Sequence, residues 1–569
     1  MLSFVEYASP QRILELLIKE RVKIAIKGKL QNVSPSSTEQ KYEQNANLTI
    51  AEQISLIMPP RNSWCRPHKR ERFLDNEKRS NKQILTRSIA LTIKKHRKTP
   101  ESHPYLKSLD AYIESLRKDI TSDEPLEFNS IKIIGKKKKV DSDGVTILRP
   151  LCTFVSLREK LLISLASKYL SEVFDPLLHE EILSYRPLRK YHNSEKPLLT
   201  DRDNAIENLQ NYRMLQRCRK QNIYVTECDI QKYFDTINHD VIRRCFSSFA
   251  EKIKEQHPHF DYKSVGRIVE AYLNSYSFYK NVVAENERLQ KLNPPQRIET
   301  PNENLFINRG CYTKEEFLAS SHKIGIPQGG ALSGLISNVV LSTVDNESIL
   351  KNDDDNRFFC RYGDDIMLMH TSKEECSRLI TQYCETLTKY KLLYHEFISV
   401  ADKQFRRNDG KVRPSLWNQK SRSPFLWGRS ENDPEQIDWI GFLGYEIRFT
   451  KEVRLRRSSL NDKFKNIKRK YHTGAKTLIA RGKFEPKGNK TIDKEILNRI
   501  AKFKGDGSHP LSTAKSLNDN KYRNTQAQKL NQYANKWLYR LLYKIAKRNN
   551  LTPQQLHHYW DKVNSRDDV

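Results

Sequence analysis

The chain has 569 residues and a formal net charge of +31, from 100 Lys and Arg against 69 Asp and Glu. This length holds about three to four domains, and the basic excess favours a polyanionic partner such as nucleic acid over a merely soluble basic surface. Nine cysteines without a C-x-x-C pair argue against zinc sites of that spacing and against a disulfide-stapled fold, and they favour a reducing cytoplasm. The first residues lack a signal-peptide pattern and no stretch is apolar over the length of a membrane span, so a membrane location is not expected.

Residues 1–125 are expected to form a helical N-terminal extension. Ser9 and Pro10 open a helix with periodic apolar residues, and the strongly basic stretch 66–98 contains a further helix. These basic charges are as typical of a solvated helix face as of a surface that binds RNA or a partner. The function of this region is left open.

Two β-prone runs follow, at 131–139 and 145–151, and the turn sequence between them predicts a two-stranded ribbon. The ribbon carries four consecutive lysines and Arg149, which suit a triphosphate because arginine can hold phosphate oxygens with two hydrogen bonds. An apolar stripe from Leu161 to Phe174 then predicts a helix that faces the core.

A second group of elements surrounds a short β-prone run that ends in Asp229, after which a helix is expected to begin with Asp240 as its N-cap. Residues 251–322 are a long insertion with room for helices of its own. The glycine-rich loop 325–330 leads into another helix. Its glycines allow a close approach of the backbone to another group, and the amide of Gln328 can both donate and accept hydrogen bonds.

The stretch 358–369 predicts a hairpin of two buried strands that carries Asp364 and Asp365 at its tip. Two adjacent carboxylates repel each other unless a cation lies between them, although a plain surface turn is the alternative. Asp229 joins them only if its strand neighbours the hairpin in one sheet. Three carboxylates that meet there suit two Mg²⁺ ions about 3.5–4 Å apart, the arrangement used for in-line phosphoryl transfer.

Residues 451–569 are the most basic part of the chain. They contain 29 Lys and Arg against 10 Asp and Glu, and the stretches 461–478 and 527–548 predict helices. Such helices are suited to bind a nucleic-acid duplex along its phosphates.

Four stretches resemble, in this order, the palm of reverse transcriptases. Residues 228–235 are similar to the first palm motif, 325–333 to the second, 362–365 to the third, and 440–445 to the primer-grip region that follows. The order of all four, and the glycine-rich second motif, make the resemblance specific.

The resemblance implies an α+β right-hand polymerase with an antiparallel palm sheet. Fingers and palm would occupy residues 126–450, and a basic helical thumb and C-terminal region 451–569. The implied enzyme is an RNA-directed DNA polymerase, a nucleotidyltransferase that adds dNTPs to a 3′-hydroxyl or other primer with two Mg²⁺ ions, for which Mn²⁺ can substitute.

The resemblance also implies a role for each candidate site residue. The catalytic residues would be Asp229, Asp364 and Asp365, and these would bind the metal ions together with Ile230. The nucleotide-binding residues would be Arg149, one lysine of 136–139 (taken as Lys137), Phe234, Gln328 and Gly329. The template- and primer-binding residues would be Arg158, Pro327, Leu443, Gly444 and Tyr445, although Arg158 is as easily explained by a pairing along its own helix.

Two positions favour different products. Phe234 matches a bulky ring that leaves no room for a 2′-hydroxyl and so selects deoxynucleotides. Gly363 stands where reverse transcriptases usually have Ala or Val, and glycine is common there in RNA-dependent RNA polymerases. We expect DNA synthesis, because a ring in the pocket has a steric consequence whereas a Gly-for-Ala change has little.

Two other places depart from the family pattern. Residues 394–397 lack the lysine that the family often uses to protonate the leaving pyrophosphate, and Lys403 is the nearest candidate. Residues 184–187 resemble a family element but lack the two residues usually seen before its arginine.

The resemblance is closest to the bacterial lineage of intron, retron and defence-associated enzymes. No nuclease signature or zinc-ligand cluster follows the thumb, which favours a defence-associated, antiphage enzyme that works in the bacterial cytoplasm with a non-coding RNA template. Its expected partners are RNA, the DNA product and dNTPs, and a homo-oligomer or a second protein partner stays open. The alternatives are an RNA-dependent RNA polymerase, a retron or group II intron reverse transcriptase of a mobile element, and an RNA-binding scaffold with a relic palm.

Overall fold

The computed structural model describes residues 2–26, 49–68, 70–74, 77–129, 131–186, 202–402, 419–428 and 436–480, with scattered positions between 526 and 561. The chain folds into two compact units, each built from three segments. The first unit contains residues 1–200, 229–353 and 379–395, and the second contains 201–228, 354–378 and 396–569. The domain boundaries expected from the sequence stay a prediction.

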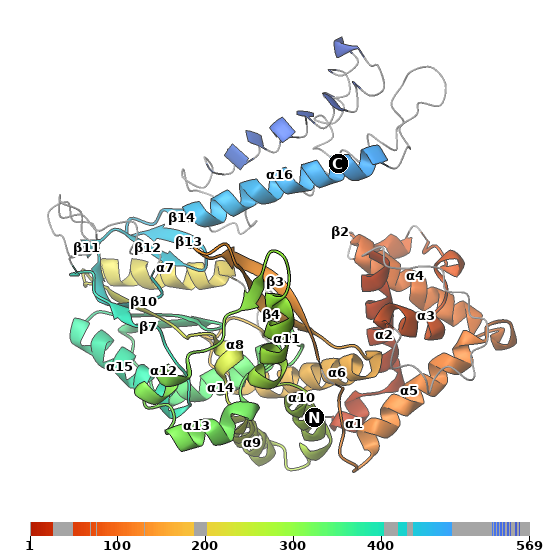
Figure 1. Ribbon diagram of the computed structural model, residues 1–569, viewed down its shortest axis with the longest axis horizontal. Helices are drawn as coiled ribbons and strands as arrows, with labels where there is room; N and C mark the ends of the chain where they lie inside the picture. Colours follow the sequence, from red (N-terminus) through yellow and green to blue (C-terminus); the bar gives the residue numbers. More distant parts are fainter. Residues whose placement is uncertain are drawn as a thin grey trace. The chain divides into compact units, whose positions relative to one another are not determined.

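The N-terminal part of the first unit is helical, as expected. Figure 1 shows its helices in red to orange. They pack against one another, and α2 and α3 also contact α6. Ser9 precedes α2 and Pro10 is its first residue, so the predicted helix start is confirmed. The elements are α1 (Phe4–Tyr7), α2 (Pro10–Ile26), α3 (Ile50–Ile57), β1 (Phe73–Leu74), β2 (Glu77–Lys78), α4 (Asn81–His96) and α5 (Tyr105–Thr121).

The predicted basic ribbon is present and has a third strand. Strands β3 (Lys132–Val140) and β4 (Thr146–Thr153) pair antiparallel, with a bulge between Lys137 and Lys139. Strand β6 (Gln296–Ile298), which comes from the insertion, adds to β4 in parallel. The sequence missed this strand because three residues far along the chain carry no local signal of their pairing.

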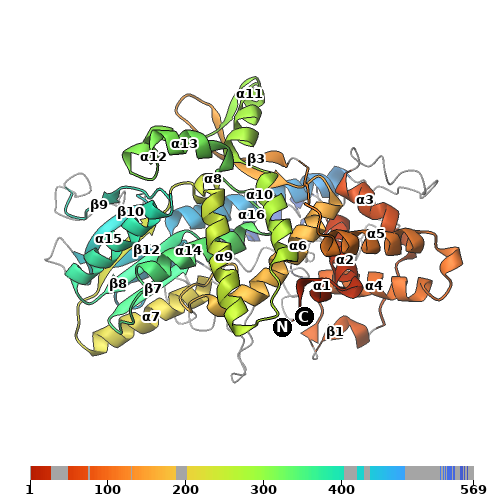
Figure 2. The ribbon, with the colours of Figure 1, turned by 90° about the horizontal axis from the view of Figure 1, so that it is seen from below.

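The remaining elements of the first unit follow the ribbon. Helix α14 lies against α9, and both pack on α6 (Figure 2). The N-cap of α9 is Asn238, whose side chain accepts hydrogen bonds from the backbone N–H groups of Asp240 and Val241, so the expected cap at Asp240 is wrong by two residues. The elements are α6 (Leu157–Phe174), α8 (Tyr233–Thr236), α9 (His239–Gln256), α10 (Lys263–Asn274), α11 (Ala284–Gln290), α12 (Glu303–Asn308), α13 (Lys314–Ser320) and α14 (Ser333–Glu347).

The second unit is built around a six-stranded sheet with the order β11-β10-β5-β8-β7, to which β9 adds beside β10. Helix α7 packs on β7, where the rings of Tyr212 and Phe358 lie 5.4 Å apart. Helix α15 begins in the second unit and ends in the first. The elements are α7 (Arg202–Cys218), β5 (Tyr224–Asp229), β7 (Arg357–Tyr362), β8 (Asp365–His370), α15 (Lys373–Lys389), β9 (Phe397–Ile398), β10 (Ser421–Trp427) and β11 (Gln436–Ile437).

The sheet is held internally by a buried ion pair beside Asp229. Arg422 of β10 contacts the carboxylate of Glu227 on β5, and both side chains are almost fully buried. Thr226 of β5 also donates to the carbonyl of Arg422, at 2.6 Å. A buried charge is tolerated only with a partner, so this pair fixes the register of β10 on β5.

A second, three-stranded sheet follows in the same unit, with β12 (Trp439–Phe442), β13 (Tyr445–Arg448) and β14 (Val453–Leu455) in order. It leads into α16 (Arg457–Ala480), which confirms the predicted helix at 461–478. The side chain of Gln526 forms hydrogen bonds with both backbone groups of Leu455, and the rings of Phe464 and Tyr533 lie 4.8 Å apart. Much of the expected helix 527–548 lies outside the described residues.

Among the residues that the structure describes, no helix has both the length and the apolar composition needed to cross a membrane.

Candidate active site

The tip of the hairpin β7–β8 carries the two adjacent aspartates, as predicted. Tyr362 pairs with Asp365 in the ladder, so Gly363 and Asp364 form a two-residue turn. Gly363 has a φ of +72°, in the left-handed region that side chains disfavour. Its glycine is therefore explained by the backbone of this turn, and it carries less weight as a sign of an RNA-synthesising polymerase.

Asp229 is the last residue of β5, and Asp365 is the first of β8. These two strands are neighbours in the sheet, which meets the topological requirement set by the sequence. Within the described ranges, no group of three or more His, Cys, Asp or Glu side chains is placed to hold a metal ion. The metal-binding role of the three aspartates and of Ile230 thus stays a prediction, supported by the sheet order and by the ligand type, since Mg²⁺ prefers carboxylate oxygens.

In the first unit, Asp229 lies beside the segment that follows α15. The backbone N–H of His395 donates to the carbonyl of Asp229 at 3.0 Å, and Nε2 of His395 lies 3.3 Å from its Oδ1. Ile230 forms a bridge with Tyr394, and the N–H of Gln231 donates to the carbonyl of Leu393. Within residues 394–397, which lack the lysine expected from the resemblance, His395 is the residue that contacts Asp229, and Lys403 lies outside the described residues.

The residues after Asp229 form a tight turn and the short helix α8. Lys232 has a φ of +46°, and its Nζ donates to the carbonyls of Glu299 and Thr300, both at 2.9 Å. Tyr233 is fully buried, whereas Phe234 is only half-buried. A core aromatic would be buried like Tyr233, so the partial exposure of Phe234 favours its predicted contact with the nucleotide.

The glycine-rich loop is bound to this helix through backbone hydrogen bonds. The N–H of Ile326 donates to the carbonyl of Phe234 at 2.8 Å, and the N–H of Gly325 donates to that of Ile237 at 2.7 Å. Gly325 has a φ of +92°, and a Cβ atom there would lie 2.9 Å from Phe278, so glycine is required. The first motif (228–235) and the second motif (325–333) are thus held together as one layer.

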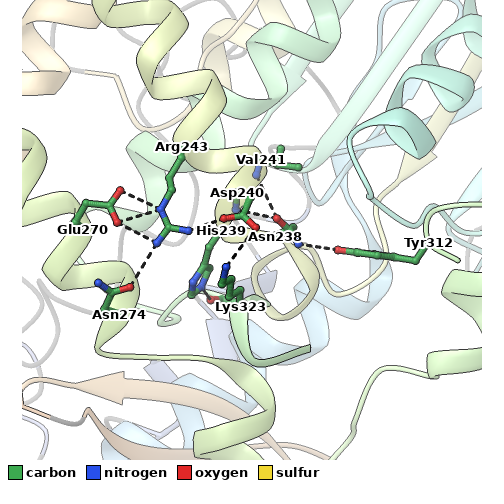
Figure 3. A network of polar contacts seen from close by, with 10 residues as sticks. Asn238, His239, Asp240, Val241, Arg243, Glu270, Asn274, Tyr312 and Lys323 are labelled. Carbon is green, nitrogen blue, oxygen red and sulfur yellow. Dashed lines mark hydrogen bonds and ion pairs between the residues drawn. The ribbon is translucent and has the colours of Figure 1, made fainter. Parts of the chain in front are cut away.

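Figure 3 shows the polar network that anchors the end of this layer. His239 contacts the carbonyl of Gly325 through Nε2 at 2.7 Å, and burial lowers the pKa of His239 to about 4, so the ring is neutral. Asn238 donates to the hydroxyl of Tyr312 at 3.2 Å, which ties the layer to the insertion. On the outer side, Arg243 pairs with Asp240 and Glu270.

The strand register places the basic residues of the ribbon. Arg149 is opposite Lys136, whereas Lys137 is opposite Leu148, whose side chain is buried among residues of the insertion. Opposite residues of an antiparallel pair share a face, so Arg149 and Lys136 share one face and Lys137 lies on the other. The register favours Lys136 over Lys137 as the lysine that acts with Arg149.

Glu299 of the insertion forms ion pairs with the next two lysines of the ribbon. Its carboxylate oxygens lie 3.1 Å from Nζ of Lys138 and 3.1 Å from Nζ of Lys139. These three side chains are partly exposed, so each pair contributes little to stability. Together with the contacts of Lys232, they link the ribbon, the insertion and the turn after Asp229.

Two arginines that the sequence singled out are engaged within the protein. Nε of Arg158 lies 2.6 Å from Oδ2 of Asp119 on α5, so it pairs with the N-terminal extension and its template contact stays a prediction. Arg186 is fully buried, pairs with Asp175 at 2.7 Å and donates to several backbone carbonyls. Its contacts are those of a structural residue.

The predicted primer-positioning hairpin is present in the second unit. Strands β12 and β13 pair antiparallel, and Leu443 and Gly444 form the turn, both with positive φ. Tyr445 begins β13 and is buried. The hairpin geometry is confirmed, and its contact with a primer stays a prediction.

Sequence reasoning missed Asp235, Glu299 and His395. Asp235 accepts a hydrogen bond from Nε2 of Gln328 at 2.8 Å and is almost fully buried. A carboxylate directly after an aromatic pair in the first motif was a usable signal, because a charged residue in an apolar run needs a partner. Glu299 and His395 gave no local signal, since their contacts lie far away in the chain.

Comparison with known proteins identifies the class of this domain. Residues 135–396 match the family model of reverse transcriptase (RNA-dependent DNA polymerase). This part of the chain, which holds the ribbon, the glycine-rich loop and the three aspartates, is a reverse transcriptase domain with the right-hand polymerase fold. The matched family is that of RNA-dependent DNA polymerases, which generally use divalent metal ions. A search of curated protein sequences gives no match.

Solved structures similar to this chain include telomerases at low identity. Telomerase from Candida albicans, in complex with a TWJ fragment of telomeric RNA, is 10% identical with a TM-score of 0.38, covering 82% of this chain and 64% of its own. Apo telomerase from Candida tropicalis is 11% identical with a TM-score of 0.37, covering 96% and 79%. A form of the latter truncated from the C-terminal domain is 12% identical with a TM-score of 0.33, covering 58% and 56%. The chain thus spans less than two thirds of the Candida albicans enzyme and of the truncated Candida tropicalis form.

The buried carboxyl of Asp235 predicts a pH dependence of stability. Burial raises the pKa of Asp235 to about 6, so its contribution to stability is fully present below the pKa of the unfolded chain and is lost as the pH rises through about 6. Asp235→Asn removes this loss. The free energy of unfolding of the variant, relative to that of the wild type, should therefore be up to about 3 kcal/mol higher at pH 8 than at pH 4. Urea unfolding at both pH values measures this gain.

The exposed Asp353 of the same unit provides the control, because Asp353→Asn changes no buried charge. An equal pH dependence in the wild type and in Asp235→Asn would contradict the assignment of a raised pKa to Asp235.

Proposed function

We propose that this protein copies an RNA template into DNA, adding dNTPs to a 3′-hydroxyl or other primer with two Mg²⁺ ions. The observation that carries this proposal is the sheet order, in which the strand ending at Asp229 neighbours the hairpin that bears Asp364 and Asp365, within a reverse transcriptase domain. The proposed ligands are these three carboxylates and the backbone carbonyl of Ile230. When bound, such ions lower the pKa of the primer hydroxyl and neutralise the leaving pyrophosphate.

The protein's own residues would hold the other reactants. The exposed Arg149 would bind phosphate oxygens bidentately, with Lys136 beside it on the same face. The half-buried ring of Phe234 would lie under the sugar and leave no room for a 2′-hydroxyl. Gln328 and Gly329 would contact the nucleotide, and Pro327 and the turn at Leu443 would contact the template–primer.

The template and the biological setting are a further part of the proposal. The motif resemblance to bacterial enzymes supports a non-coding RNA template and a role in antiphage defence in the bacterial cytoplasm. The charge of +31 supports RNA and DNA as the partners. Sequencing of the nucleic acid that co-purifies with the protein tests this part: one recurrent non-coding RNA with its complementary DNA supports it, and random cellular RNA contradicts it.

The carboxylates of the hairpin tip predict the loss of activity on neutralisation. Asp364→Asn and Asp365→Asn each lower dNTP incorporation on an RNA template by roughly 10³-fold or more, because metal ions contribute several kcal/mol to the transition state. Primer extension with Mg²⁺ measures this. The exposed Asp355, on the loop before β7 in the same unit, gives the control Asp355→Asn, which should retain activity. Undiminished synthesis by the double variant at 364 and 365 would exclude these ligands.

The ring of Phe234 predicts the choice of sugar. The wild type should prefer dNTPs, and Phe234→Ala should lower the ratio of kcat/KM for dNTP over rNTP by roughly tenfold or more, because the space for a 2′-hydroxyl opens. Steady-state incorporation of the two nucleotide types measures the ratio. Tyr233→Phe is the control, because that neighbouring ring is buried. A wild type that prefers rNTPs would favour the rival RNA-dependent RNA polymerase.

A further inference from the structure

Asp235 lies at the centre of the layer that joins the first motif, the ribbon and the glycine-rich loop. It belongs to α8, directly after Phe234, and only 6% of its surface is exposed. Its Oδ1 accepts a hydrogen bond from Nε2 of Gln328 at 2.8 Å. A buried carboxylate has a high desolvation cost, so its presence here calls for a specific role.

The backbone of Gln328 is fixed independently of this contact. Its carbonyl accepts from the N–H of Cys152 on β4 at 2.9 Å, and the residue bridges Leu151. The preceding carbonyl, that of Pro327, accepts from the hydroxyl of Ser333 at 2.6 Å, and Ser333 in turn contacts the buried hydroxyl of Tyr272. With the backbone held on both sides, the remaining freedom of Gln328 is that of its side-chain amide.

The chemistry of the two partners sets the direction of that amide. An ionised carboxylate only accepts hydrogen bonds, whereas a glutamine amide has a donating and an accepting end. The amino group of Gln328 must therefore face Asp235. Its Oε1 accepts no hydrogen bond from the residues that the structure describes, so it is the polar end available to a ligand.

The charges around Asp235 favour the ionised form at neutral pH. Lys232, Lys138 of β3 and Arg149 of β4 bring positive charge toward it and act against the effect of burial, which raises its pKa to about 6. The other titratable groups near it, Cys152 and Tyr276, have raised pKa values and are neutral at this pH. Below about pH 6 the carboxyl gains an O–H, which can donate to Oε1 of Gln328 and allow the amide to turn over.

We propose that Asp235 is a positioning residue that holds the Gln328 amide in one orientation, with Oε1 presented as a hydrogen-bond acceptor to a donor group of the incoming nucleotide. This inference rests on the proposed function and adds a residue that does not itself touch the nucleotide. Asp235 acts through Gln328 alone.

A double-mutant cycle on the full-length protein tests this. Asp235→Asn keeps the shape but offers Gln328 both a donor and an acceptor, and Gln328→Met keeps the length and removes the amide. We expect Asp235→Asn to lower kcat/KM for dNTP roughly tenfold, mainly through KM, and to add no further loss in the Gln328→Met background. The wild type should also lose kcat/KM below about pH 6 by a step that is absent in both Asp235→Asn and Gln328→Met.

A result against the positioning role of Asp235 can be distinguished from a result against the proposed polymerase function. Asp235→Asn removes a buried charge, so its fold should be retained, and circular dichroism checks this. The positioning role would be overturned if Asp235→Asn lowered kcat/KM equally in the wild-type and the Gln328→Met backgrounds. It would also be overturned if the pH step of the wild type persisted in Asp235→Asn. A wild type that extends no primer on RNA with dNTPs and Mg²⁺ would instead overturn the proposed function.

Discussion

Repulsion between neighbouring carboxylates is the constraint on which this domain depends. Asp364 lies on the two-residue turn between β7 and β8, beside Gly363 with its positive φ, and Asp365 follows it as the first residue of β8. The strand next to β8 ends in a third carboxylate, Asp229. Adjacent carboxylates such as Asp364 and Asp365 repel each other unless a cation neutralises them, and this cost supports the proposed metal-dependent reaction over a plain surface turn.

Around Asp229, the first unit joins the groups proposed for catalysis and substrate binding in one framework. Backbone hydrogen bonds join the glycine-rich loop to the helix of Phe234, and further ones join the loop to β4 of the ribbon. The insertion adds β6 to the ribbon and brings Glu299 to Lys138 and Lys139. A shift of one of these parts would move the others, so the groups proposed to bind the phosphates and the sugar keep their positions relative to one another.

Features with a local cause were predictable from the sequence. The hairpin β7–β8, the ribbon β3–β4 and the helix that begins at Pro10 follow from alternation, turn residues and helix capping within a few positions. The motif resemblance located the aspartates and Gln328. Features that depend on distant pairing were not predictable: β6, the contact of Asp229 with His395, and the lysines bound by Glu299. The N-cap of α9 could not be located from the sequence alone, because Asn238 and Asp240 lie two residues apart and both residue types cap helices well.

The most direct test of the central claim is a structure of the protein with an RNA template, a primer, a dNTP and Mn²⁺, with the ions located by their anomalous signal. The account predicts two ions about 3.5–4 Å apart, bound by Asp229 together with the aspartates of the β7–β8 turn. Ions bound without Asp229, or an Asp229 side chain directed away from the turn in that complex, would contradict it.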